Sequence, residues 1–201
     1  MKILDCVQGT PEWFQARLGI PSASNFDMIV TTKGEPSKQR TKYMYRLAGE
    51  FVAGKAEEGY QSQAMLNGVQ TEEEARSFYE FTKGVEVKQV GFCVSDCGRY
   101  GCSPDGLIGD NCLIEIKCPT VAVHVGYLLD NSLPTDYFQQ TQGQLLVTGR
   151  EYVDFVSYYP CLKPLIVRVE RDEKFLALLE SELKIFYQEL QEVINKIKGD
   201  T

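Results

Sequence analysis

Histidine is nearly absent from this sequence, because His124 is the single one among 201 residues. A histidine-rich zinc centre is therefore excluded, and a Ser-His-Asp triad is disfavoured. Long apolar runs are missing too, since none approaches the roughly 18 residues of a membrane span. The opening residues, Met1 to Asp5, do not have the pattern of a signal peptide. We therefore expect a cytoplasmic protein that does not enter a membrane.

The sequence contains no C-x-x-C pair, although it has seven cysteines. An odd number of cysteines without secretory features predicts reduced thiols. These cysteines fall on both faces of the strands predicted below, which disfavours a zinc or iron–sulfur site. Repeats, low-complexity tracts and linkers are missing as well. With 43% hydrophobic and 24% charged residues, residues 1–201 are expected to form one globular domain with a sizeable core.

Positive charge is in short supply, because the formal net charge is −7. This balance disfavours a general nucleic-acid coat protein, but an enzyme can concentrate basic residues in one channel. The most basic window, residues 33–46, is the best candidate for contacts with a DNA backbone. A solvated helix face explains the same pattern equally well. The basic residues of this window are Lys33, Lys38, Arg40, Lys42 and Arg46.

Two short apolar runs carry the most informative pattern, Cys102 to Leu107 and Leu113 to Cys118, with a Gly-Asp-Asn turn between them. In an extended strand Glu115 and Lys117 share one face, because side chains alternate between faces. A carboxylate and an ammonium group buried in a sheet need polar partners or a metal. Across the turn, Asp105 is expected on the neighbouring antiparallel strand, beside Glu115.

These residues have a chemical interpretation as a metal site. The carboxylates of Asp105 and Glu115, with the main-chain carbonyl of Ile116, form an all-oxygen site that suits Mg²⁺ or Mn²⁺. A bound cation lowers the pKa of its water, and Lys117 would orient that water towards a phosphodiester. The alternative is a structural ion pair between Glu115 and Lys117. The residues of this stretch leave both interpretations open.

The first helix is predicted to begin at residues 10–12, which supply a threonine N-cap, a proline and an acid. Trp13 is expected in the core, and Arg17 near the end of this helix. Ser22 and Ser24 precede a second short helix. Because helix N-termini and hydroxyl groups bind anions, Arg17 and the two serines could hold a phosphate. Helix capping is the default role of both serines.

The remaining periodicities predict an α/β fold, with a mixed sheet of about five strands flanked by helices. The final segment is strongly amphipathic, which is typical of a core helix or a subunit contact. Helices are predicted over 61–82, from 121 onwards, over 135–147 and over 172–198, and strands over 85–95, 100–107, 113–117, 152–159 and 165–169.

Taken together, the motifs resemble the phage-type alkaline exonucleases typified by phage lambda exonuclease, the YqaJ-like viral recombinases within the PD-(D/E)xK superfamily. The resemblance extends from Trp13 to the terminal helix, and the motifs occur in the order found in the family. They are W-x3-R-L-G at 13–19, S-A-S at 22–24, G-x3-E at 68–72, C-S-P-D-G at 102–106, E-I-K-C-P at 115–119 and Q-x-Q at 140–142.

The resemblance implies a restriction-endonuclease-like core and a nuclease that digests one strand of duplex DNA from a 5′ end. It leaves a 3′ single strand for strand-annealing recombination. By motif position, Asp105 and Glu115 would ligate Mg²⁺, with Mn²⁺ as a possible substitute, and Lys117 would activate the water. Glu72 would complete the acidic cluster, and Gln140 would help to place the nucleophile.

The resemblance also implies a pocket for the terminal 5′-phosphate, formed by Arg17, Ser24 and Ser103. Met65 matches the position of an apolar wedge that separates the terminal base pair, and Asp96 matches an acid near the site. Further implications are a ring-shaped homotrimer around DNA, a single-strand-annealing partner protein and a phage or prophage origin in a bacterial host. Two alternatives are another nuclease of the same superfamily, such as an endonuclease, and a DNA-binding protein on a degenerate nuclease fold.

Overall fold

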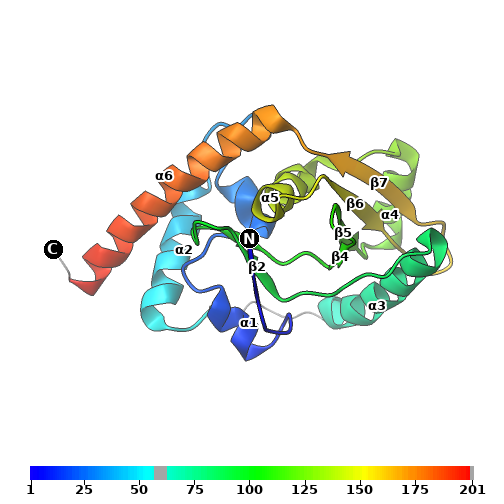
Figure 1. The fold of residues 1–201 in the computed structure, drawn as a ribbon, viewed down its shortest axis with the longest axis horizontal. Coiled ribbons are helices and arrows are strands. Elements are labelled where there is room, and N and C mark those ends of the chain that lie inside the picture. The colour runs from blue at the N-terminus through cyan, green and yellow to red at the C-terminus, as the bar shows by residue number, and fades with distance from the viewer. Residues whose placement is uncertain (57–62, 200–201) are drawn as a thin grey trace.

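The structure of the chain, a computed structural model, describes residues 1–56 and 63–199, and for residues 63–70 it describes the backbone alone. Figure 1 shows an α/β arrangement in which helices surround two small sheets. This architecture confirms the predicted fold class. No helix among the described residues is long and apolar enough to cross a membrane.

The larger sheet has the strand order β4-β5-β6-β7 and is mixed. Strands β5 and β6 run parallel, and the outer pairs are antiparallel. A parallel pair needs a long crossover, and α4, η2 and α5 supply it here. The strands are β4 (Gly106–Ile108), β5 (Cys112–Lys117), β6 (Tyr152–Ser157) and β7 (Leu165–Glu170).

The second sheet is antiparallel and corrects the expectation of one sheet with about five strands. It contains β1 (Lys2–Leu4), β2 (Phe92–Val94) and β3 (Gly101–Cys102) in that order. The strand predicted over 100–107 is interrupted between β3 and β4, where Pro104 has no N–H to donate to a ladder. The interruption allows the chain to pass from one sheet to the other.

The helices follow the predicted order closely. Thr10 caps α1, because its side chain accepts a hydrogen bond from the main-chain N–H of Trp13. Asp172 caps α6 in the same way, through the N–H of Phe175. The helices are α1 (Pro11–Ala16), η1 (Ala23–Met28), α2 (Arg40–Ala53), α3 (Gln63–Lys83), α4 (Val121–Asp130), η2 (Thr135–Tyr137), α5 (Phe138–Thr148) and α6 (Glu173–Lys198), of which η1 and η2 are 3₁₀ helices.

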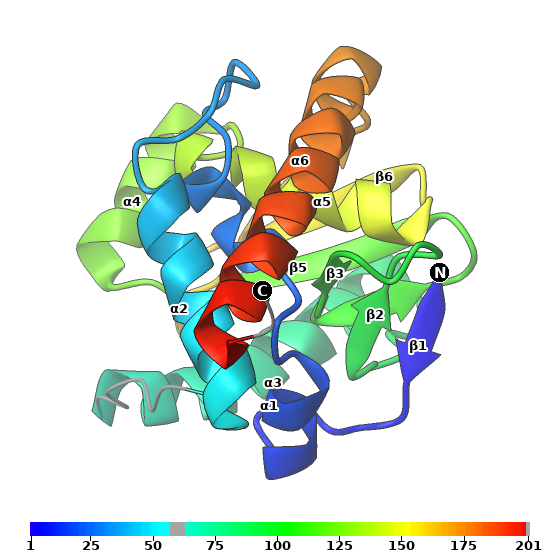
Figure 2. The ribbon, with the colours of Figure 1, turned by 90° about the vertical axis from the view of Figure 1, so that its left-hand side faces the viewer.

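Helix α6 contributes its apolar stripe to the main core, as predicted for a core helix. Figures 1 and 2 show α6 beside α2 on one flank of the molecule. The guanidinium of Arg40 on α2 forms ion pairs with Glu182 and Glu189 on α6. The buried stripe consists of Phe175, Leu179, Leu183, Phe186, Leu190 and Ile194.

Helix α5 lies at the junction of the two sheets, where it contacts β2 and β3 of one and β6 of the other. It also packs closely on η1 at Gly143. A Cβ atom added there would come within 2.4 Å of the Phe26 ring. Only glycine permits this close approach, which brings the polar side chains of α5 towards η1 and the segment between β3 and β4.

Candidate active site

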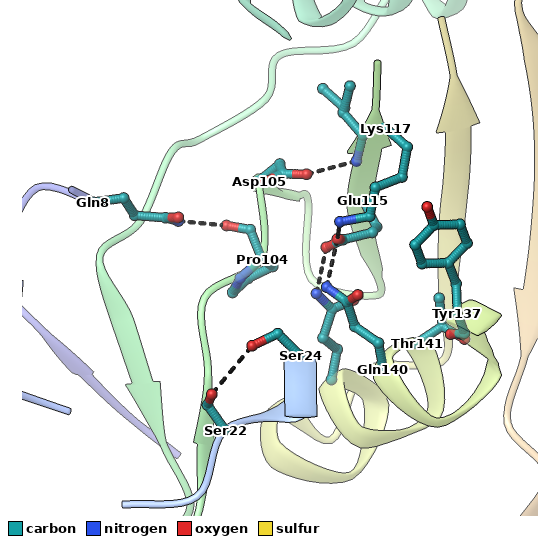
Figure 3. Close-up of polar contacts among 12 residues, drawn as sticks. Gln8, Ser22, Ser24, Pro104, Asp105, Glu115, Lys117, Tyr137, Gln140 and Thr141 are labelled. Carbon is teal, nitrogen blue, oxygen red and sulfur yellow. Dashed lines mark hydrogen bonds and ion pairs between the residues drawn. The ribbon is translucent and has the colours of Figure 1, made fainter. Parts of the chain in front are cut away.

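A cavity of about 170 Å³ lies at this junction and collects most of the residues singled out in the sequence. Its volume is below the ~300 Å³ of typical ligand pockets, so it suits a phosphate-sized group rather than a whole nucleotide. Figure 3 shows the side chains that converge here from three places: strand β5, helix α5 and the segment that joins β3 to β4. The lining residues are Gln8, Trp13, Arg17, Ala23, Ser24, Ser103, Asp105, Glu115, Lys117, Gln140 and Gln144.

Asp105 lies immediately before β4 and beside β5. The register pairs Gly106 with Ile114, which places Asp105 opposite Glu115. One carboxylate oxygen of Asp105, Oδ2, accepts a hydrogen bond of 2.6 Å from the main-chain N–H of Ile116. The bond anchors the side chain between two strand residues whose side chains face the cavity.

Glu115 is the centre of the polar network, with only 2% of its side chain exposed. Lys117 lies on the same face of β5, and its Nζ is 2.6 Å from Glu115 Oε1. From α5, Gln140 donates to Oε1 and Gln144 donates to Oε2, each at 2.5 Å. Figure 3 shows these contacts converging on the carboxylate. The structural ion pair considered from the sequence is therefore present, but within a wider network that opens to a cavity.

The electrostatics of this cluster are those of crowded acids. Burial and the neighbouring carboxylates of Glu115 and Glu72 raise the pKa of Asp105 well above its ordinary value. Burial lowers the pKa of Lys117, but the attraction of Glu115 and Asp105 outweighs this and raises it. Lys117 is therefore a firmly charged ammonium group, suited to holding a water or an anionic oxygen in place.

Glu72 lies on α3, which packs against β5, but it does not line this cavity. It lines a neighbouring cavity of about 860 Å³ that also includes Asp105, and its carboxylate pairs with Arg76 at 3.0 Å. Burial raises the pKa of Glu72, and the charge of Glu115 adds to that increase. The acid predicted to complete the cluster thus lies beside it and is engaged by an arginine.

The predicted phosphate-binding residues form the opposite wall of the cavity. Arg17 donates from Nη2 to Ser22 Oγ at 2.9 Å, and its guanidinium lies 3.9 Å from the centroid of the Trp13 ring. Ser22 Oγ is 3.2 Å from Ser24 Oγ. Burial lowers the pKa of Arg17, but a guanidinium stays charged. Among the described residues no carboxylate forms an ion pair with Arg17, so its charge remains available for an anion.

Two expectations for this wall change. Trp13 is not a core residue but is partly buried, and its indole Nε1 donates to Ser103 Oγ at 2.9 Å. Ser22 occupies the N-cap position of η1 without a capping hydrogen bond from its side chain. The default capping role is therefore wrong for Ser22, because its hydroxyl turns towards Arg17 instead. The first departure places a polar group at the cavity, and the second fixes the guanidinium of Arg17, which lines it.

Two residues predicted from the sequence are not found at the cavity: the structure does not describe the side chain of one, and the other lies away from it. Met65 belongs to the part of α3 whose side chains lie outside the described residues. Asp96 is 91% exposed, pairs with the amino group of Met1 and does not line the cavity. In the basic window, Arg40 is held by its two glutamates, whereas Lys33, Lys38 and Lys42 are exposed.

The donor set fits a hard divalent cation. Two carboxylates approach each other on adjacent strands, and oxygen ligands of this kind are what Mg²⁺ and Mn²⁺ prefer. Burial, and then the neighbouring carboxylates, raise the pKa of Asp105, and a cation bound beside it would offset the repulsion from those carboxylates. Among the described residues, however, no three acidic, histidine or cysteine side chains form a ready-made metal site. Water, main-chain carbonyls or DNA oxygens would have to supply further ligands.

Sequence reasoning did not assign a role to Gln8 or Gln144. Gln8 Nε2 donates to the main-chain carbonyls of Val90 and Pro104, both at 2.9 Å, and so fixes the segment that carries Asp105 (Figure 3). No sequence signal indicates that contact, which joins distant parts of the chain. Gln144 did carry a signal, because it follows Gln140 at the spacing of one helical turn.

The chain is similar to known proteins in sequence and in fold. Residues 12–151 match the YqaJ-like viral recombinase domain. Two crystal structures of the alkaline exonuclease LHK-Exo from Laribacter hongkongensis, one in complex with dAMP, are similar to this chain. They have 35% identity and a TM-score of 0.86, over 95% of this chain and 97% of theirs.

A phage related exonuclease from Haemophilus somnus shares the fold. It has 12% identity and a TM-score of 0.68, over 89% of this chain and 96% of that chain. The comparison with curated proteins gave no match.

Proposed function

The chain belongs to the YqaJ-like viral recombinase family, and from that premise we propose that it is a Mg²⁺-dependent exonuclease that digests one strand of linear duplex DNA from its 5′ end. Membership of this family implies a DNA exonuclease of recombination. The direction of digestion, the metal and the residue roles are the proposal. Mn²⁺ would substitute for Mg²⁺, because both are oxygen-seeking cations of similar coordination preference.

One observation carries the proposal. A single cavity has a partly buried arginine with hydroxyl groups on one wall, and two carboxylates with a lysine on the other; no described carboxylate forms an ion pair with that arginine. The first wall has the chemistry of a phosphate site, since Arg17 can form charge-assisted bonds to phosphate oxygens. The second has the chemistry of phosphodiester hydrolysis. Their proximity favours an enzyme that binds one phosphate and cleaves at the next.

The residue roles follow from these positions. Arg17, Ser24 and Ser103 would bind the terminal 5′-phosphate. Asp105 and Glu115, with the main-chain carbonyl of Ile116, would hold the cation, which when bound would make its water a better nucleophile and stabilise charge on the phosphate. The ammonium of Lys117 would hold the attacking water in line with phosphorus, and Gln140 would support it. Glu72 would add negative charge beside the cation.

The reaction is hydrolysis of the first internucleotide bond. Water adds its oxygen to phosphorus and loses a proton, and the P–O3′ bond breaks as O3′ takes up a proton. The released nucleotide keeps its own 5′-phosphate, and the shortened strand gains a new one. That new phosphate is the group that Arg17 binds, which gives a physical reason for repeated cutting along one strand. The dAMP in the structure of the LHK-Exo relative is of the same chemical class as the released product.

The deciding experiment offers the protein Mg²⁺ and three DNA substrates: a linear 5′-phosphorylated duplex, a nicked circle and a closed circle. The proposal expects digestion of the linear duplex, with label lost from the 5′ end first and one strand left intact. A nuclease that cuts the closed circle would instead be an endonuclease of the same superfamily. An inactive protein that still binds the duplex would be a DNA-binding protein on a degenerate nuclease fold.

The family resemblance also leads us to propose a homotrimeric ring and a single-strand-annealing partner protein. A ring whose bore carries the exposed lysines of residues 33–46 would reconcile a net charge of −7 with DNA binding. Light scattering of the purified protein tests the ring directly, because a trimer has three times the 22.7 kDa mass of one chain. A monomer at micromolar concentration would contradict this part of the proposal.

A further inference from the structure

Gln144 bonds to a different oxygen of the Glu115 carboxylate from its other partners. It lies one helical turn after Gln140 on α5, so both amides point to the same side of the helix. Gln140 Nε2 donates to Oε1 of Glu115, and Gln144 Nε2 donates to Oε2, each at 2.5 Å. Helix α5 therefore fixes both oxygens of one side chain, and with them the rotation of the carboxylate plane.

The two oxygens of Glu115 differ in how much of their bonding capacity is used. A carboxylate offers about four lone-pair sites, two on each oxygen. Oε1 already bonds to Gln140 and to Lys117, whereas Oε2 bonds to Gln144 alone in the part of the chain described here. Oε2 is therefore the oxygen that retains a site for a cation without giving up a partner. Gln144 is the residue that orients it.

The other end of the Gln144 amide is unsatisfied. The residue is 1% exposed, and its carbonyl Oε1 has no hydrogen-bond partner among the described residues. The amide cannot turn over, because its carbonyl oxygen would then face the Glu115 carboxylate. A buried carbonyl without a partner is costly, and an apolar side chain of the same size would avoid that cost. Less than 1 Å² of this oxygen is accessible to water, so the bond that the NH₂ group makes to Glu115 is what offsets the cost.

We propose that Gln144 is a positioning residue of the hydrolytic site. Its NH₂ group fixes Oε2 of Glu115 as a ligand atom for the cation. The inference rests on the proposed function, because it assumes a cation between Asp105 and Glu115. It extends that function by assigning each oxygen of Glu115 its own glutamine.

The test measures Mn²⁺ binding to the full chain by electron paramagnetic resonance of the free ion, in the absence of DNA. Gln144→Met keeps the volume and removes both polar groups. Gln139→Met is the matched control, since Gln139 is also buried on α5 but donates to the main-chain carbonyl of Val30, at 3.3 Å. Loss of a group that orients a metal ligand weakens binding about 10- to 100-fold. We expect that loss for Gln144→Met, and little change for Gln139→Met.

A second measurement separates positioning from general damage. With linear DNA, Gln144→Met should lower kcat about tenfold or more and leave the KM for DNA unchanged. If Gln144→Met does not fold, Gln144→Asn replaces it, because that variant keeps an amide but withdraws it from Glu115, and the same losses are expected. Wild-type Mn²⁺ affinity and kcat in a folded Gln144 variant would overturn the inference alone. A wild-type protein that neither binds Mn²⁺ nor digests DNA would instead overturn the proposed function and the inference with it.

Discussion

The indole Nε1 of Trp13 donates a hydrogen bond to Ser103 Oγ at 2.9 Å, across 90 positions of sequence. The face of the same ring lies 3.9 Å from the guanidinium of Arg17. One side chain therefore positions both a cation and a hydroxyl that face the cavity. We therefore expect the phosphate-binding wall to depend on this shared support.

Replacement of Trp13 by phenylalanine tests that support. Trp13→Phe keeps an aromatic face for Arg17 but removes the donor to Ser103, a bond worth roughly 0.5–1.5 kcal/mol. We expect the preference for 5′-phosphorylated over 5′-hydroxyl ends to fall by up to about tenfold, since 1.4 kcal/mol corresponds to a factor of ten. In a double-mutant cycle, Ser103→Ala should add little to Trp13→Phe. Fully additive losses would show that the two residues act independently.

Arg17→Ala removes the partly buried guanidinium itself. Charge-assisted hydrogen bonds contribute about 1.5–3 kcal/mol, so the preference for phosphorylated ends should fall roughly 10- to 100-fold. Digestion rates on duplexes with 5′-phosphate and 5′-hydroxyl ends provide the measurement. Arg99→Ala serves as control, because Arg99 lies beside the ring of Tyr187 and not at the cavity. Equal losses on both kinds of end would contradict the phosphate role.

Lys117→Ala should abolish most of the turnover while it leaves cation binding largely intact. The ammonium pairs with Glu115 Oε1 but is not itself a metal ligand. Loss of a group that positions or activates a nucleophile typically costs about 10²- to 10⁴-fold in rate. Single-turnover digestion and Mn²⁺ titration of the same preparation provide the two measurements. Unchanged turnover would refute the role of Lys117, and exposed Lys88 offers a control substitution.

Asp105→Asn should stabilise the metal-free protein at alkaline pH. Burial and the charges of Glu115 and Glu72 raise the pKa of Asp105, so the folded state favours the protonated carboxyl. The stability that the protonated Asp105 carboxyl contributes is fully present at pH values below the ordinary pKa of a carboxyl group. It is lost as the pH rises through the raised pKa of the folded state. Without metal at pH 8, the variant should melt about 2–4 °C above the wild type.

The same melting experiment has an internal check. At pH 4 the difference between Asp105→Asn and the wild type should disappear, because both side chains are then neutral. Added Mg²⁺ should raise the melting temperature of the wild type more than that of the variant. Asp110→Asn, in the exposed turn between β4 and β5, provides the control. A variant less stable than the wild type at pH 8 would contradict the raised pKa of Asp105.

Local sequence signals identified most of the elements that build the site. The cap at Thr10, the alternation around Glu115 and the apolar stripe of α6 each depend on neighbours in sequence, and each predicted its element. The division into two sheets was missed. Pro104 indicated an interruption, but the pairing of β3 with β2 and of β4 with β5 depends on strands that the local sequence does not specify.

The candidate site shows the same limit. The motifs indicated Arg17, Asp105, Glu115, Lys117 and Gln140, all of which line one cavity. Their supporting contacts were not predictable, because the partners are set by tertiary packing. Trp13 looked like an ordinary core residue until its hydrogen bond to Ser103 was visible.

A crystal structure with Mn²⁺, located by its anomalous scattering, tests the central claim most directly. The account predicts one ion bound by a carboxylate oxygen of Asp105 and by Oε2 of Glu115, at about the 2.0–2.2 Å of small oxygen-bound cations. No anomalous peak between these residues at saturating Mn²⁺, or a peak only elsewhere on the protein, would contradict it.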